Sequence, residues 1–311
     1  MKPIYEASHI HLDITNVCTG NCNYCSRYTR HLREDQHYFM DLDYFDRTLK
    51  ALEDYPGMIG FMGGDPILHP HFNEMCEIIR ASGKNPPERM SLFTCAKEPA
   101  WSEVKESVYK TFHKNNVWIS LHKPNIDHTH QPITLAIDEV VPDKKYKQHL
   151  IDNCWVNLIW CPSVNHKGGF FCEVALALDL LLDGPGGFDA TDPDWWKAEV
   201  DDYKHQVDNA CNKCGMAIPL KTEIVYAFDA GDYKEKITPN LYKEFTKNNL
   251  KKLGPEDVEI VTEFPSTEEL IKIEATRTPA GAGNYNRSTS DQVFYDTFFK
   301  DMDCPDYEGI I

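Results

Sequence analysis

Hydrophobic and polar positions follow two alternating periodicities along the first half of the chain. Residues His9–Thr15 (HIHLDIT) alternate with a period of two, which predicts a strand. Residues Asp41–Asp54 carry apolar side chains at helical spacing, and Met58–Met62 (MIGFM) is a short apolar run typical of a buried strand. The same patterns predict helices over His71–Arg80 and Trp101–Lys114, and strands over Met90–Thr94, Val117–Leu121 and Ile133–Val141.

A repeated order of strand, loop and helix is typical of a parallel sheet or barrel. Such folds place their active sites in the loops at the carboxyl ends of the strands. Two unusual loops occupy this position: residues 18–25 (CTGNCNYC) after the first strand, and Gly63-Gly64 after the second. We expect these two loops to share one site.

The pattern changes after about residue 150. A strand-like run at Trp155–Trp160 precedes a cysteine-rich stretch and a helical segment at Glu173–Leu182, and the chain from Met216 to Ile311 is acidic. The acidic region has helical patterns at Asn240–Leu253 and Thr267–Ala275. These changes predict three parts, with boundaries at 1–150, 151–220 and 221–311.

Composition narrows the class of protein. Of 311 residues, 41% are hydrophobic and 12% aromatic, enough to bury a sizeable core. The net charge of −17 argues against nucleic acid as a partner, because phosphate binding needs a basic surface. No apolar run approaches the roughly 18 residues that span a bilayer, and the N-terminus lacks the apolar segment of a signal peptide. We therefore expect a soluble cytoplasmic protein that has no membrane partner.

The chain has eleven cysteines, and without a signal peptide they indicate metal or redox chemistry rather than disulfides. Cys18, Cys22 and Cys25 form a C-x3-C-x2-C group. Structural zinc sites usually take four ligands, whereas this loop supplies three and leaves a position open for a substrate. The alternatives to an iron–sulfur cluster are a structural zinc ion or buried thiols.

CTGNCNYC after a strand, followed by Gly63-Gly64-Asp65-Pro66 after a later strand, resembles the radical S-adenosylmethionine (SAM) superfamily. In that family three cysteines hold a [4Fe-4S] cluster whose open iron binds SAM, and an electron from the cluster cleaves SAM to a 5′-deoxyadenosyl radical. The resemblance implies a partial (β/α)6 TIM-type barrel and makes Cys18, Cys22 and Cys25 the cluster ligands.

The resemblance also assigns residues to SAM itself. The family's GGE-type motif meets the methionine amino group, and here Asp65 replaces its usual glutamate. The resemblance implies further SAM contacts at Tyr24, near the adenine, and at Thr94 and Ser120, which follow later strands. A structural role at strand ends is the alternative for Thr94 and Ser120.

A second group of cysteines follows residue 150. Two pairs of thiolates hold zinc as readily as iron and sulfur. In this context the pattern resembles the Twitch domain, a shortened SPASM domain, which is a small α+β domain that holds one auxiliary iron–sulfur cluster. The residues that match its C…GG-x2-C and C-x2-C motifs are Cys161, Gly168, Gly169, Cys172, Cys211 and Cys214. Cys154 is interpreted as a packed thiol, and the acidic extension after residue 220 resembles no known domain.

The remaining candidates carry weaker signals. Cys95 either lines the cofactor site or packs, and Cys76 lies on the apolar stripe of its helix. Cys304 is a hypothetical hydrogen-atom donor, if the C-terminal region folds over the barrel. The basic residues after the cluster loop read as a solvated face: Arg27, Arg30 and Arg33.

The sequence thus predicts a radical SAM oxidoreductase or epimerase with an auxiliary cluster. Its expected substrate is a small polar molecule, such as a carbohydrate, aminocyclitol or nucleoside, and its expected reductant is a flavodoxin or ferredoxin. The alternatives are a peptide-modifying radical SAM maturase and a zinc-binding module without turnover.

Overall fold

The computed structural model describes residues 1–20, 22, 25–119, 134–159, 162–219, 234–247 and 258–276. A six-stranded sheet in the order β4-β3-β2-β1-β5-β6 forms its centre. The strands are β1 (His9–Thr15), β2 (Met58–Gly63), β3 (Met90–Thr94), β4 (Val117–Ile119), β5 (Ser163–Asn165) and β6 (Gly168–Phe170).

Strands β1 to β4 run parallel, with His9 opposite Met58 and Leu92 opposite Val117. Strand β5 lies parallel to β1 on its other side, and β6 returns antiparallel to β5. The carboxyl ends of β1, β2 and β3 therefore share one edge of the sheet. This edge carries the cysteine loop, the Gly63-Gly64 loop and Thr94, as predicted.

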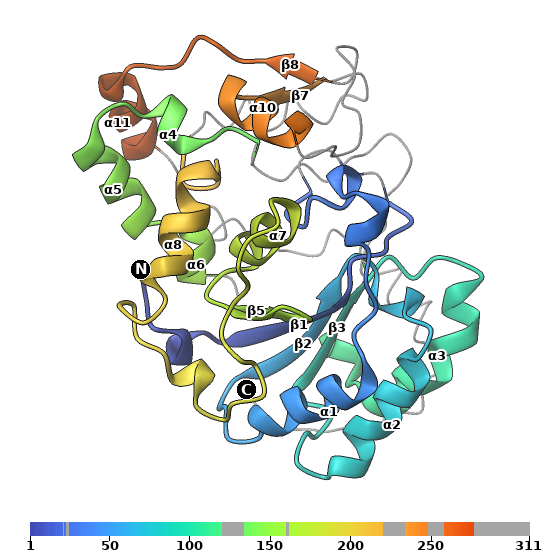
Figure 1. The fold of residues 1–311 in the computed structure, drawn as a ribbon. Helices are drawn as coiled ribbons and strands as arrows, with labels where there is room; N and C mark the ends of the chain where they lie inside the picture. The colour runs from blue at the N-terminus through green and yellow to red at the C-terminus, as the bar shows by residue number, and fades with distance from the viewer. Residues whose placement is uncertain are drawn as a thin grey trace.

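Three helices cover one face of the sheet: α1 (Leu42–Ala51), α2 (Phe72–Ser82) and α3 (Ala100–Thr111). Figure 1 shows them together on the side away from α7. The Asp41 carboxylate caps α1 by accepting from two backbone N–H groups, which explains why that helix begins there. Phe61 of β2 packs edge-to-face on Phe45 of α1, Phe72 of α2 and Phe112, which directly follows α3. All three helices are therefore packed against this strand.

The rest of the described chain lies beyond the other face and end of the sheet (Figure 1). Helix α7 (Glu173–Leu181) has almost every residue buried, as expected for a helix that is apolar all round. The other elements are α4 (Ile137–Val140), α5 (Lys144–Asp152), α6 (Trp155–Ile159), α8 (Lys204–Ala210), β7 (Glu235–Ile237), α10 (Pro239–Lys247), β8 (Val258–Ile260) and α11 (Thr267–Thr276). Short 3-10 helices occur at Ile4–Glu6, Thr29–His31, Glu34–Gln36, Pro66–Leu68, Lys114–Asn116, Trp195–Lys197 and Cys211–Lys213.

Two strand predictions are wrong. The run Ile133–Val141 contains helix α4, in which Ile137 and Val140 are buried at a spacing of three, and Trp155–Ile159 forms helix α6. Short apolar runs do not distinguish a strand from a buried helical turn, and β-branched residues biased both predictions.

The described residues therefore form an α/β fold with a mostly parallel sheet. They contain five parallel strands and one antiparallel strand, and they do not display the six β/α units expected of the barrel. Strands β5 and β6 join the same sheet as the N-terminal strands, whereas the boundaries at residues 150 and 220 stay predictions. No helix in the described ranges has the length and apolar character needed to cross a membrane.

Candidate functional site

The loop after β1 is anchored at its start by polar side chains. The Thr15 hydroxyl donates to the carbonyl of Tyr38 at 2.8 Å, and the Asn16 amide donates to the carbonyl of Gln36 at 2.8 Å. These bonds tie the end of β1 to residues 36–38, which lie beyond the cysteines in the chain. The loop that holds all three cysteines is thereby closed at both ends.

The three cysteines of this loop are half-buried. A Cβ placed on Gly20 would lie 3.3 Å from Cys18 Sγ and 3.5 Å from Cys22 Sγ, so both thiols turn toward the same point of the loop. The Gly20 N–H donates to Cys18 Sγ at 3.2 Å, and the Thr29 hydroxyl donates to Cys25 Sγ at 3.5 Å. Donors to sulfur favour the thiolate, which is the form that binds a metal.

The pKa of the Cys18 thiol is lowered to about 7. A hydrogen bond from the Cys95 side chain is its largest cause, burial opposes it, and the Gly20 N–H adds to it. A thiol with this pKa is substantially ionised at neutral pH and is ready for metal binding.

The Gly63-Gly64 loop lies directly against the start of the cysteine loop. The Gly64 N–H donates to the Thr15 carbonyl at 2.9 Å, and the Asp65 N–H donates to the Val17 carbonyl at 2.8 Å. A Cβ on Gly64 would lie 2.1 Å from the Val17 oxygen, which is closer than any real contact. Glycine is required here because the two backbones touch.

Replacing Gly64 with alanine is expected to lower the iron content of the reconstituted protein and to destabilise it by about 1–3 kcal/mol. The added methyl group must push Val17 away, and Val17 precedes Cys18. Gly83→Ala is the matched control, because Gly83 has a φ of +65° but nothing within 4 Å of an added Cβ. We expect that control to lose about 1–2 kcal/mol of stability with unchanged iron content. Equal iron content in the two variants would contradict the role given to this backbone contact.

The side chains of Asp65 and Thr94 are in contact, as expected for residues at the same edge of the sheet. The Thr94 hydroxyl donates to Asp65 Oδ1 at 2.6 Å, and the Cys95 N–H donates to Asp65 Oδ2 at 3.2 Å. Burial raises the pKa of Asp65, although these hydrogen bonds oppose it. Pro66 begins a 3-10 helix immediately afterwards. The carboxylate therefore joins the loops after β2 and β3, so its first role is to position them.

The sheet face opposite α1 to α3 carries a buried charged group that sequence reasoning missed. Arg27 is 5% exposed and pairs with Asp13 at 2.6 Å and with Glu173 at 2.8 Å, and His11 lies 3.7 Å from Glu173. We name Asp13, Arg27, Glu173 and His11 the charged core. The expectation that Arg27 belongs to a solvated face is wrong, and the period-two polar positions of HIHLDIT on a doubly buried strand were the available signal.

The pKa values of the two carboxyl groups in the charged core are shifted in opposite directions. Burial raises the pKa of Glu173, but Arg27 and His11 together outweigh burial and hold that pKa at about 2. For Asp13, burial raises the pKa more than Arg27 lowers it. The charged form is therefore favoured at Glu173, where His11 adds to Arg27, whereas burial prevails at Asp13.

The second group of cysteines converges around one small cavity beneath α7. Its lining includes Cys154, Cys172, Cys211 and Cys214. Burial raises the pKa of both Cys211 and Cys214, and the neighbouring thiols of this group raise it further. Burial, with a smaller contribution from Cys154, raises the pKa of Cys172 to about 12. Cys154 precedes helix α6 rather than beginning a strand, and it belongs to this group.

The paired glycines near this group are required by the close packing around them. Gly168 has a φ of +121°, and a Cβ there would lie 2.3 Å from the Phe188 oxygen. A Cβ on Gly169 would lie 2.6 Å from the ring of Trp195. The glycines thus allow the β5–β6 hairpin to pack directly under the tryptophan pair, and Trp196 anchors that region to α1 by donating to the Ala51 carbonyl at 3.1 Å.

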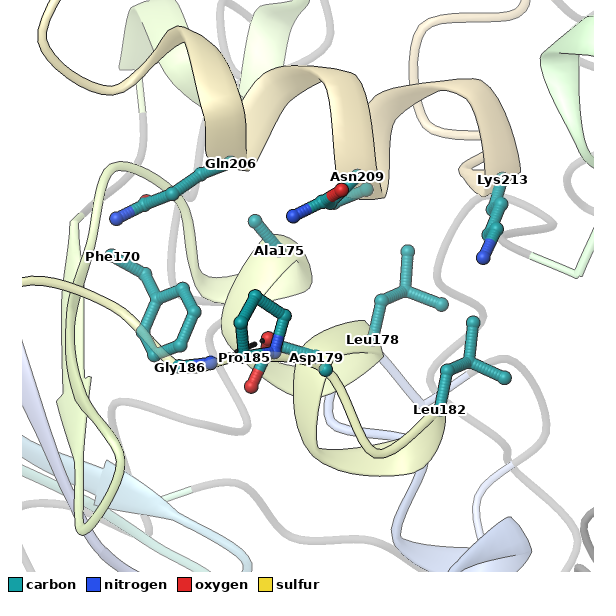
Figure 2. A pocket seen from close by; sticks show the side chains of 12 residues that line it. Phe170, Ala175, Leu178, Asp179, Leu182, Pro185, Gly186, Gln206, Asn209 and Lys213 are labelled. Carbon is teal, nitrogen blue, oxygen red and sulfur yellow. Dashed lines mark hydrogen bonds between the residues drawn. The ribbon is translucent and has the colours of Figure 1, made fainter.

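A second cavity, of about 120 Å³, lies between α7 and α8 (Figure 2). Leu178 and Leu182 line it from α7, and Gln206 and Asn209 line it from α8. Leu178 also lines the cavity of the second cysteine group. The two cavities are therefore neighbours along α7.

Tyr28 lies between the two groups of cysteines. It is fully buried, its N–H donates to the Cys25 carbonyl at 2.9 Å, and its pKa is raised well above normal, first by burial and then by Cys214, Glu235 and Cys25. Its ring packs edge-to-face on Phe245 of α10. The segment that follows the first cysteine loop is thus covered by the C-terminal region.

A buried contact between a histidine and a glutamate strengthens this cover. His31 lies 2.9 Å from the carboxylate of Glu235 on β7, and both residues are almost fully buried. This contact holds β7, in the C-terminal region, against the 3-10 helix Thr29–His31, which follows the first cysteine loop.

Four predicted site residues lie outside the described residues: Tyr24, Ser120, Cys161 and Cys304. Within the described ranges, no group of three His, Cys, Asp or Glu side chains meets the geometry for one metal ion. The donor sets themselves are soft thiolates with hydrogen-bond donors aimed at sulfur, which is the chemistry of iron–sulfur sites. The donor chemistry of the described residues in the first loop therefore suits the implied cluster.

Comparison with known proteins agrees with this geometry. Residues 12–134 match the family model of the radical SAM superfamily. A search of curated proteins found no match.

Two crystal structures of BtrN are similar to this chain. The complex of BtrN with AdoMet and 2-DOIA has 16% identity and a TM-score of 0.41, over 67% of this chain and 93% of that one. SeMet BtrN in an open conformation has 15% identity and a TM-score of 0.42, over 71% of this chain and 97% of that one. Both similarities are distant.

Proposed function

We propose that this protein is a radical SAM enzyme that removes hydrogen from a carbon of a small polar substrate. The observation that carries the proposal is the meeting of the Cys18 loop, Gly63-Gly64 and Thr94 at one edge of the sheet. The match to the superfamily model implies a [4Fe-4S] cluster and SAM. When bound, the two supply a 5′-deoxyadenosyl radical after transfer of one low-potential electron, for which a flavodoxin or ferredoxin is a suitable donor.

The chain's own residues bind and orient these groups. Cys18, Cys22 and Cys25 would hold the cluster, and Gly63 and Gly64 let the loop after β2 pack directly on the backbone at the start of the cysteine loop. Asp65 keeps the loops after β2 and β3 together through its bonds to Thr94 and Cys95. A fixed geometry of this kind is what positioning of a reactive radical requires.

The second cysteine group supports the proposal of an auxiliary iron–sulfur cluster in a Twitch-like region. Four thiols line its cavity, and Tyr28 interacts electrostatically with a cysteine of each group, Cys25 and Cys214. The proposed ligands are Cys161, Cys172, Cys211 and Cys214, and Cys154, which lines the cavity, is the alternative to Cys161. An auxiliary cluster would accept the electron that a substrate radical releases, and this favours oxidation over epimerisation.

The proposed substrate is a carbohydrate, aminocyclitol or nucleoside. The charged core, whose Arg27 lies two residues after Cys25 in the chain, makes the inner face of the sheet polar, and its side chains are buried and paired with one another. A peptide substrate remains the second candidate, and a zinc-binding module without turnover remains the third. The cytoplasmic location stays a prediction.

Iron counting after anaerobic reconstitution tests the two-cluster proposal. Wild-type protein is expected to bind roughly eight irons, and Cys211→Ala/Cys214→Ala roughly four. Among single variants, loss of the second cluster in Cys154→Ala, with the cluster retained in Cys161→Ala, would make Cys154, which lines the cavity, the fourth ligand. If Cys161→Ala loses the second cluster while Cys154→Ala keeps it, the fourth ligand is Cys161. Four irons in the wild type, together with bound zinc, would contradict the proposal of an auxiliary iron–sulfur cluster.

The substrate class is tested with deuterated candidates and reduced enzyme. Transfer of deuterium from a polyol, aminocyclitol or nucleoside into 5′-deoxyadenosine would identify the class. Transfer from a peptide alone would establish the second candidate instead.

A further inference from the structure

The proposed function makes no use of the cavity between α7 and α8. This cavity has a volume of about 120 Å³, and no residue of the first cysteine loop lines it. One water molecule needs about 10–15 Å³ of such space, so the cavity holds roughly ten non-hydrogen atoms. It therefore has room for one small organic molecule.

Hydrogen bonds and an ion pair hold the walls of this cavity in place. The Gln206 amide accepts from the Phe171 N–H at 3.0 Å and donates to a carbonyl of β6 at 3.2 Å, which fixes α8 against the hairpin. On the α7 side, Asp179 accepts from the Gly186 N–H at 3.0 Å and pairs with Lys167 at 2.5 Å. The cavity is therefore preformed, and a ligand enters it without reordering these walls.

The lining combines apolar side chains with two hydrogen-bond donors. Figure 2 shows Leu178 and Leu182 from α7 opposite Asn209 and Lys213. Asn209 and Lys213 are four residues apart, on α8 and the 3-10 helix that continues it, so their side chains are neighbours on one helical face. The Asn209 amide has no hydrogen-bond partner among the residues that the structure describes. A ligand can therefore meet an apolar surface and a pair of donors at once.

Lys213 supplies the positive charge of this site. Its ammonium lies 3.3 Å from Glu244 of α10, and the two side chains are 38% and 43% exposed. An ion pair as exposed as this contributes little free energy, so the ammonium can turn to another carboxylate at small cost. Asp179, the carboxylate of the lining, is already paired with Lys167. The available polar groups of the cavity are thus an ammonium and an amide, both of them donors.

We propose that this cavity binds a small carboxylate with a compact apolar body. Its two oxygens accept from the Lys213 ammonium and the Asn209 amide, and its apolar body covers Leu178 and Leu182. Hydrogen bonds between charged groups are about twice as strong as neutral ones, so a carboxylate is favoured over an alcohol or an amide of the same shape. The inference goes beyond the proposed function and does not depend on it.

Three probes separate the contributions of charge and apolar surface. Purified full-length protein is titrated with isocaproate, isocaproamide and acetate by isothermal titration calorimetry. We expect saturable binding of isocaproate. Isocaproamide has the same shape without the charge and should bind about tenfold more weakly, because it loses the charge-assisted bonds. Acetate keeps the charge but lacks the apolar body, and it should bind at least about tenfold more weakly as well.

Variants of the lining place the binding in this cavity. Lys213→Met should lower the affinity for isocaproate about tenfold and leave the affinity for isocaproamide unchanged. Lys204→Met is the matched control, because Lys204 lies on the exposed side of α8, pairs with Asp208 at 3.6 Å and does not line the cavity. Leu182→Trp fills the space and should abolish binding of both probes. If that variant does not fold, Leu182→Phe replaces it and should weaken both.

Equal affinities for isocaproate and isocaproamide would overturn the proposal, as would the absence of saturable isocaproate binding. Unchanged binding in Lys213→Met or in the Leu182 variant would place the ligand elsewhere and reject this site. An equal loss in Lys204→Met would also reject it, because the effect would then come from net charge rather than from a contact. Each of these results leaves the proposed function intact, since that function is tested by iron content and SAM cleavage.

Discussion

Replacing Cys18, Cys22 and Cys25 together with alanine is expected to reduce 5′-deoxyadenosine formation to the background of the assay. In the proposed function these three thiolates hold the cluster, and the other residues at this edge of the sheet hold the loop rather than replace its thiolates. The measurement is 5′-deoxyadenosine released from SAM by reduced enzyme, together with iron per chain, which should fall by roughly four.

Cys76→Ala is the control for this experiment, because it removes a thiol from the core of α2 without touching the loop. It should keep both its iron and its SAM cleavage. Undiminished cleavage in the triple variant would place the cluster elsewhere and reject the assignment of the first cysteine group.

Replacing Arg27 with methionine is expected to lower the free energy of unfolding by about 3–5 kcal/mol. The change leaves Asp13 and Glu173 buried with no cation between them, and both carboxylates are almost fully hidden from water. Chemical denaturation, followed by circular dichroism, measures the loss. Arg47→Met is the matched control: Arg47 pairs with Asp43 on the exposed side of α1, and its loss should barely change stability.

A compensated variant separates burial of charge from loss of packing. Asp13→Asn and Glu173→Gln, added to Arg27→Met, should recover most of the lost stability, because neutral groups are far less costly to bury. Failure of this recovery would mean that Arg27 acts mainly through packing of its aliphatic chain.

The loss of stability caused by Arg27→Met should depend on pH. In the wild type the pKa of Glu173 is about 2, below its usual 4.5, so its contribution to stability is present above pH 4.5 and is lost as the pH falls toward 2. In the variant, burial dominates and the pKa of Glu173 is raised. The variant's penalty is then largest at neutral pH and shrinks on acidification, so the two stability curves should converge as the pH falls.

Local patterns allowed most of the N-terminal half to be predicted. The strand His9–Thr15 and the strand Met90–Thr94 have the predicted bounds, and the helix after Asp41 begins where that side chain caps it. These elements were predictable because their signals, periodicity and capping, lie within a few residues of one another. The same patterns failed at residues 133–141 and 155–159, where short apolar runs proved helical.

The sequence by itself determined the first cysteine loop, the Gly63-Gly64 loop and their common edge, because each follows a parallel strand and the ends of parallel strands meet. Only the tertiary structure decided that Cys95 lies beside Cys18, that Cys154 joins the second cysteine group, and that Arg27 is buried. Those facts depend on side chains that are far apart in the chain and meet only after the sheet and α7 have packed. No local pattern carries the direction of a single thiol or the burial of a single charge, since both are set by the neighbours that folding brings together.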